Sequence, residues 1–211
     1  ASSPKVVCDL ISSTMLQGTG FDRRLLAPPT NPTPIPEEAE VVVVGGGLLG
    51  MAAASRLIAK GHSVIILEQR TLVGGIWSMH ANSTSQVNSS EGGYCLKEFL
   101  PHDSPRRHAH NRDHSTAAEV LADLAELGKS LAEVTFTQVQ VVSVLGANGD
   151  YHVVCAQCGA GVGGAPSTRV IKCSGVVLSI NDRVGMPRSL QVPGMDVFHG
   201  VMADGTSDQL A

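Results

Sequence analysis

The chain has 211 residues, of which 43% are hydrophobic and 16% are charged, so it can form a packed core, and global disorder is excluded. A formal net charge of −4 disfavours nucleic acid as a partner. The longest apolar run, residues 41–54, is shorter than the roughly 18 residues that a transmembrane helix needs, so no transmembrane segment is expected. The five cysteines are an odd number and do not indicate a secreted disulfide framework, which favours a reducing compartment.

The first 38 residues are rich in proline and lack a sustained apolar period. The run 28–36 breaks helices and lacks the donors of a sheet ladder, so it should be extended. We expect residues 1–38 to form an extended arm that binds other protein subunits, with Arg23 and Arg24 meeting acidic groups or polar headgroups. Its apolar anchors would be Val6, Val7, Leu10, Ile11, Leu25 and Leu26. Such an arm is compatible with peripheral association with a membrane complex. The expected compartment is the cytoplasm or an organelle, and the start Ala-Ser-Ser suits a protein that is imported into an organelle such as the chloroplast and processed at its N-terminus.

A strand, a helix and a second strand are predicted next. Residues 41–44 are four valines, a pattern typical of a strand buried on both faces. A helix is expected from about Leu48 to Lys60, with Gly61 as its terminator. Residues 63–67 predict a second buried strand. Together they indicate a βαβ unit with two adjacent parallel strands.

The turn between the first strand and the helix matches G-x-G-x-x-G at residues 45–50. Gly45 allows the tight turn, Gly47 lets a diphosphate approach the backbone, and Gly50 lets helix and strand pack closely. This hexapeptide is a weak signal by itself. It is specific here because it follows a buried strand and opens a helix.

The helix start and the end of the second strand complete the predicted dinucleotide site. The first helical turn, which includes Leu49, would offer N–H groups and a positive dipole end to phosphates. Glu68 follows Gly45 by 23 positions and can accept hydrogen bonds from both ribose hydroxyls. Its negative charge would repel a 2′-phosphate.

The remaining elements are a loop, a helix and a set of strands. Residues 69–114 are expected to be loop, and Thr116 and Glu119 form a capping box that opens a helix ending at Gly128. Apolar residues then recur with a period of two, which predicts strands joined by a tight turn at Asn148 and Gly149. One or two strands are expected at residues 135–145, and single strands at residues 151–156, 168–173 and 175–180.

A second motif distinguishes FAD from NAD. Glu68 is followed, a few residues on, by Gly74-Gly75-Ile76-Trp77. Here the sequence resembles the flavin-containing monooxygenases and their Baeyer–Villiger relatives, whose FAD-binding segment is an acidic residue followed by G-G-x-W. The resemblance implies that Gly75 passes close to FAD and that Trp77 lies near it. It also implies that Asn88, in the stretch Asn-Ser-Ser-Glu, lies near the isoalloxazine ring and assists oxygen chemistry.

The resemblance implies an α/β fold, a Rossmann-like FAD-binding domain at residues 39–200. This domain would have a parallel sheet with helices on one face and a three-stranded β-meander on the other. The sequence departs from the family at Ser179-Ile180-Asn181, where a Thr-Gly pair is usual, and at Asp204, where a histidine is usual.

The resemblance also implies a second Gly-rich βαβ unit for NADPH, which the sequence does not predict. The stretch 159–164 is rich in glycine, but it follows a meander strand and opens no helix. We therefore expect residues 201–211 to be a tail where an NADPH domain would stand, and the FAD-binding domain to be catalytically incomplete on its own. The alternative is a non-catalytic scaffold, a subunit of a large organellar or photosynthetic complex that reuses the flavoprotein fold.

Two clusters have the composition of metal sites, and both are interpreted otherwise. The first cluster is Cys155 and Cys158 with Cys173 and His152. It contains a single C-x-x-C with no partner pair, and alternate residues of a hairpin point to opposite faces, so structural cysteines are expected. Residues 102–114 contain four histidines and three arginines, which are expected to face solvent or a partner. No metal is predicted.

Overall fold

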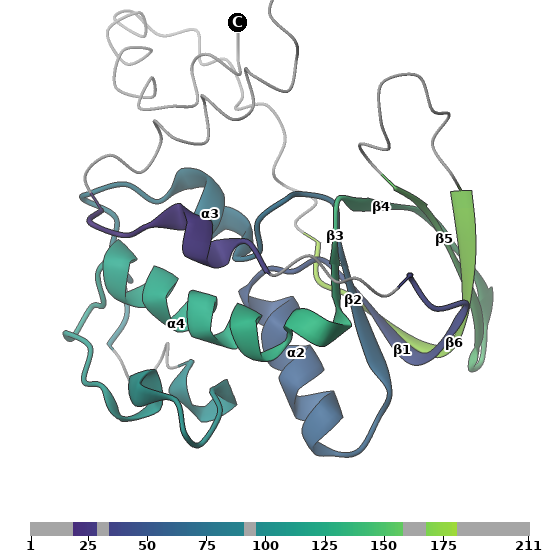
Figure 1. The fold of residues 1–211 in the computed structure, drawn as a ribbon, viewed down its shortest axis with the longest axis horizontal. Coiled ribbons are helices and arrows are strands. Elements are labelled where there is room, and N and C mark those ends of the chain that lie inside the picture. The colour runs from purple at the N-terminus through teal and green to yellow at the C-terminus, as the bar shows by residue number, and fades with distance from the viewer. Residues whose placement is uncertain (1–18, 29–33, 91–95, 158–167, 181–211) are drawn as a thin grey trace, which may run out of the picture.

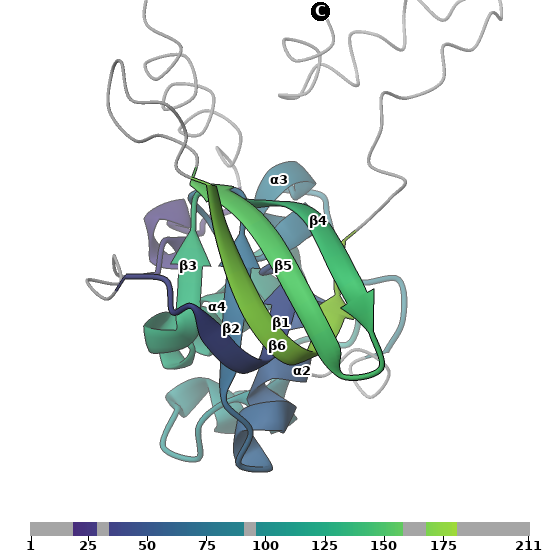
Figure 2. The same cartoon turned by 90° about the vertical axis from the view of Figure 1, so that its right-hand side faces the viewer.

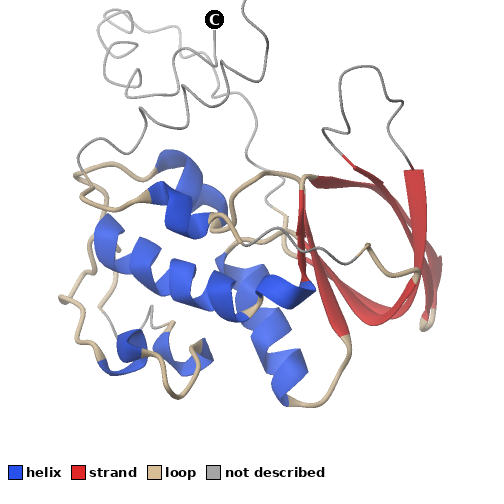
Figure 3. Ribbon diagram, in the orientation of Figure 1, coloured by secondary structure: helices blue, strands red, loops and turns tan. Residues whose placement is uncertain are grey.

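The computed structural model describes residues 19–28, 34–90, 96–157 and 168–180. Six strands form one mixed sheet in the order β3-β2-β1-β6-β5-β4, and the helices cover one face of it (Figures 1 and 3). The strands are β1 (Glu38–Val44), β2 (Val64–Glu68), β3 (Thr135–Thr137), β4 (Val139–Ala147), β5 (Asp150–Gln157) and β6 (Thr168–Leu178). The α-helices are α2 (Leu48–Ala59), α3 (Gly75–His80) and α4 (Ala117–Ser130), and the 3-10 helices are η1 (Arg23–Leu26), η3 (Lys97–Phe99), η4 (Pro105–His108) and η5 (Ala132–Val134).

The central strand β1 is buried on both faces, as its valines predict. It pairs in parallel with β2, which confirms the βαβ interpretation, and also in parallel with β6. Val43 belongs to the core beneath the helices, whereas Val42 and Val44 belong to a second core beneath the meander. Side chains alternate along a strand, so an uninterrupted valine run supplies both cores.

The meander β4-β5-β6 covers the second face of the parallel strands (Figure 2). Its first turn has positive φ at Asn148 and Gly149, as predicted for a two-residue hairpin loop. The expected α/β fold is thus confirmed, with the meander hydrogen-bonded to β1 through β6 in one continuous sheet. The prediction of two strands at 168–173 and 175–180 was wrong. Gly175 lies within β6, where a side chain would contact Val41 of the neighbouring strand.

The helix α4 runs past Gly128, the residue predicted to end it. Gly128 is buried, and an added Cβ there would lie 2.9 Å from a Val73 methyl carbon, so this glycine serves close packing. The helix start is as predicted: the Glu119 carboxylate accepts hydrogen bonds from the Thr116 N–H at 2.8 Å and from its hydroxyl at 2.7 Å. The region 69–114 is not all loop, because it contains α3, η3 and η4.

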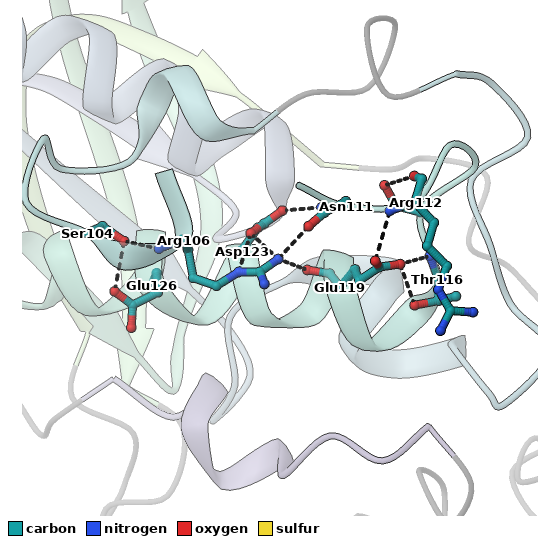
Figure 4. A network of polar contacts seen from close by, with 9 residues as sticks. Ser104, Arg106, Asn111, Arg112, Thr116, Glu119, Asp123 and Glu126 are labelled. Atoms are coloured by element: carbon teal, nitrogen blue, oxygen red, sulfur yellow. Dashed lines mark hydrogen bonds and ion pairs between the residues drawn. The ribbon is translucent and has the colours of Figure 1, made fainter. Parts of the chain in front are cut away.

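A polar network holds the segment before α4 against that helix (Figure 4). Arg106 pairs with Asp123 at 2.7 Å, and the Asp123 side chain is only 4% exposed. Asn111 donates to the other Asp123 oxygen at 2.8 Å and accepts from Arg106 at 2.7 Å. The buried carboxylate therefore has partners on both oxygens, which is what a buried charge requires.

Part of the predicted arm packs on its own domain. Leu26 is 1% exposed and belongs to the core beneath the helices, so it is not available as a partner-facing anchor. Leu25 is 61% exposed, as an anchor would be. The segment around both is the 3-10 helix η1, which is compact where an extended chain was expected. The other anchors, Val6, Val7, Leu10 and Ile11, lie outside the described residues.

Candidate functional site

The Gly-rich turn lies at the carboxyl end of β1 and leads directly into α2. Gly45 has a φ of +102°, and its N–H donates to the Leu67 carbonyl of β2 at 2.9 Å. An added Cβ at Gly45 would lie 2.5 Å from the Ser179 carbonyl oxygen, and one at Gly50 would lie 2.0 Å from the Gly45 carbonyl oxygen. Both positions therefore require glycine, for the reasons predicted from the motif.

Glu68 ends β2 and turns its carboxylate toward the Gly-rich turn, as predicted. Its Oε2 accepts the Gly46 N–H at 2.8 Å, and its Oε1 accepts the Arg70 N–H at 2.8 Å. Glu68 is 8% exposed, so the carboxylate is held in one orientation by backbone donors. Each oxygen keeps further acceptor capacity for ribose hydroxyls.

The Gly74-Gly75 segment packs directly on the turn. The Gly74 N–H donates to the Gly46 carbonyl at 2.8 Å. An added Cβ at Gly75 would lie 3.0 Å from the Gly47 Cα, and both Gly74 and Gly75 have positive φ. The two glycine motifs, separated by more than twenty residues in the sequence, thus form one contiguous backbone surface.

This surface fits a dinucleotide diphosphate. At Gly47, the N-cap residue of α2, an added Cβ would meet only the Gly75 Cα, at 3.7 Å, so the backbone there is open to close approach. The first N–H groups of a helix have no partners within it and carry its positive dipole end. Leu49 lies in this first turn and is 73% exposed. The turn, the helix start and the Glu68 carboxylate thus lie together at one edge of the sheet, the arrangement predicted for a dinucleotide site.

Two cationic side chains lie next to Glu68 and α3: Arg70, which the sequence analysis did not single out, and Arg23, which it assigned to the acidic groups or polar headgroups of a partner. Arg70 donates from Nη1 to the Ser78 hydroxyl at 3.2 Å, and Arg23 donates from Nη2 to the Ser78 carbonyl at 2.5 Å. Burial, together with the positive charges of Arg70 and Arg23, lowers the pKa of His80. The only sequence signal for this cluster is the position of Arg70, two residues after the acidic residue.

Two further residues are suggested by the family resemblance, and the proximity of Trp77 to FAD stays a prediction. Trp77 is half-buried in α3 and packs against the core beneath the helices. Asn88 is exposed and follows the buried Val87, whose N–H donates to Ser115 at 2.9 Å just before α4. The proximity of Asn88 to a flavin ring stays a prediction. Residues 158–167 and 181–211, which include Cys158, Asn181 and Asp204, lie outside the described residues.

The candidate metal clusters do not form a metal site in the described part of the chain. Cys155 and Cys173 are buried free thiols, and burial raises the pKa of both. Across residues 19–28, 34–90, 96–157 and 168–180, no group of three or more His, Cys, Asp or Glu side chains is placed to hold a metal ion. Within those same ranges no helix is long and apolar enough to cross a membrane.

Comparison with curated proteins reveals plant relatives. The chain is 28% identical over 198 residues to flavin-containing monooxygenase FMO GS-OX2 of Arabidopsis thaliana, covering 83% of this chain and 41% of that protein. FMO GS-OX4 of the same plant is 25% identical over 195 residues, covering 80% and 40%. The chain therefore spans about two fifths of the length of these relatives.

Solved structures share the fold. A flavin monooxygenase variant from Stenotrophomonas maltophilia matches with a TM-score of 0.50 at 25% identity, covering 68% of this chain and 38% of that one. Bacillithiol disulfide reductase from Bacillus cereus matches with a TM-score of 0.54 at 19% identity, covering 77% and 45%. The sequence profile of the family described as FAD dependent oxidoreductase matches residues 40–175, from β1 into β6 and including both glycine motifs. The chain belongs to the FAD dependent oxidoreductase family.

Proposed function

We propose that this chain is the FAD-binding part of a flavin-dependent monooxygenase. The observation that carries the proposal is the joint surface of residues 45–50 and 74–75, with the Glu68 carboxylate fixed beside it. The sequence likeness to the Arabidopsis flavin-containing monooxygenases, which extends over most of this chain, supports the monooxygenase class.

Different residues would bind different parts of FAD. The N–H groups at the start of α2 would bind the diphosphate, and Glu68 would accept hydrogen bonds from the adenosine ribose. Gly74 and Gly75 would let the cofactor pass close to the backbone, because neither carries a side chain. FAD supplies the electron-transfer and oxygen chemistry when bound, and the protein supplies binding and orientation.

We also propose that these 211 residues do not complete a catalytic cycle alone. Turnover of a flavin monooxygenase requires a hydride donor, and a nicotinamide donor needs a binding site of its own. Among the described residues, one Gly-rich turn joins a parallel strand to a helix, and FAD is assigned to it. Substrate oxidation would then depend on a reductant site contributed from elsewhere.

Two measurements on the purified chain test these proposals. Flavin released by denaturation should be FAD, identified by chromatography against FMN. The FAD-loaded chain should show no NADPH oxidation above that of free FAD. Sustained NADPH oxidation would contradict the proposed incompleteness, whereas failure to bind FAD would contradict the flavoprotein function and favour the non-catalytic scaffold.

A further inference from the structure

The N-terminal segment around η1 contacts the second glycine motif at three points. The Leu26 carbonyl accepts the Val73 N–H at 3.1 Å. The Leu26 Cδ2 atom lies 3.7 Å from where a Gly74 Cβ would stand. The Arg23 guanidinium donates to the Ser78 carbonyl in α3. In Figure 1, η1 (purple) accordingly lies beside α3.

These contacts hold both ends of the segment that lies on the Gly-rich turn. Val73 precedes Gly74, whose N–H bonds to Gly46, and Ser78 follows Gly75, which packs on Gly47. A glycine has no side chain whose packing could fix its backbone, so contacts of neighbouring residues must hold Gly74 and Gly75 at their positive φ. The Ser78 hydroxyl adds to this by donating to the Gly75 carbonyl at 2.8 Å.

We propose that η1 is a clamp that keeps residues 73–78 in their FAD-binding position, with Arg23 as its positioning residue. The inference rests on the proposed FAD site but concerns a different segment, which precedes β1 and lies outside the matched family region of residues 40–175. Arg23 would act on FAD through Ser78 and the two glycines. Leu26, buried in the core, would anchor the clamp to the domain.

The test compares Arg23→Ala with Arg24→Ala in the full 211-residue chain. Arg24 is the matched control, because its side chain is 90% exposed and pairs with Asp22, the N-cap residue of η1. FAD affinity is measured by quenching of flavin fluorescence, and folding by thermal unfolding without FAD. Hydrogen exchange of peptides covering residues 70–80 reports on the segment directly.

We expect Arg23→Ala to weaken FAD binding about tenfold, the scale of one charge-assisted hydrogen bond, and to speed exchange across residues 73–78. Arg24→Ala should change neither quantity, and Arg23→Lys should restore part of the affinity. Equal FAD affinity and exchange in Arg23→Ala and wild type would overturn the proposal. If Arg23→Ala does not fold, the Arg23→Lys and Arg23→Gln variants take its place, and unchanged affinity in both would overturn it equally. Wild-type chain that binds no FAD would instead contradict the proposed function.

Discussion

Substituting Gly50 by alanine tests the geometry of the Gly-rich turn most sharply. The new Cβ would stand 2.0 Å from the Gly45 carbonyl oxygen, which must move about 1 Å to restore a contact of 3.0 Å. Overpacking of this kind costs about 3 kcal/mol at a rigid position. Alanine recovers about 1 kcal/mol of helix propensity. The net loss is about 2 kcal/mol, which corresponds to roughly 4–8 °C in Tm for a chain of this size.

Thermal unfolding and FAD titration of the Gly50→Ala variant measure both consequences. Displacement of the turn should also weaken FAD binding about tenfold, or about 1.4 kcal/mol. Gly175→Ala in β6 is the matched control, because a Cβ there meets Val41 at an ordinary 3.6 Å. The control should keep the wild-type Tm and FAD affinity. The reasoning is refuted if Gly50→Ala matches the control in both measurements.

Three further predictions concern charged groups of the domain. Glu68→Gln should lower FAD affinity about tenfold, since it removes the charged acceptor beside Gly46. Isothermal titration measures this affinity, and an unchanged value would contradict the role of Glu68 as ribose acceptor. Asp123→Ala should destabilise the chain by about 3 kcal/mol in urea unfolding because it leaves Arg106 without its carboxylate, whereas the exposed Asp103→Ala should change stability by less than about 0.5 kcal/mol. The pKa of His80 is held below its ordinary 6.5, first by burial and then by Arg70 and Arg23. The unfolded chain therefore binds this proton more readily, so the free energy of unfolding should fall as pH drops below about 6.5. His80→Gln should flatten this part of the profile of unfolding free energy against pH, measured by urea unfolding. Identical profiles for the variant and the wild type would contradict this prediction.

Local patterns predicted the elements of the site because each is encoded within a few residues. The valine run, the glycines at 45, 47 and 50 and the acidic strand end at Glu68 all lie in one βαβ unit. In such a unit, chain connectivity alone fixes which groups meet. The structure adds the Gly46–Glu68 hydrogen bond, which explains why an acidic residue at this strand end also shapes the turn.

The features that were not predicted depend on contacts between residues far apart in the sequence. Gly128 was predicted to end its helix because glycine often does so. Its lack of a side chain instead lets α4 pack closely against Val73. Leu26 was predicted to contact a partner because the proline-rich flanks suggested an extended arm, but its side chain packs in the core of its own domain. Arg23 reaches Ser78 across 55 positions of sequence, a pairing that no local period or motif indicates.

The most direct test of the central claim is the affinity of the wild-type chain for FAD compared with FMN. In the proposed site, Glu68 would recognise the adenosine ribose and the start of α2 would recognise the diphosphate, and FMN has neither group. We expect FAD to bind at least about a hundredfold more tightly than FMN, a difference of about 2.8 kcal/mol. Equal affinities for the two flavins, or no binding of FAD at about 1 mM, would contradict it.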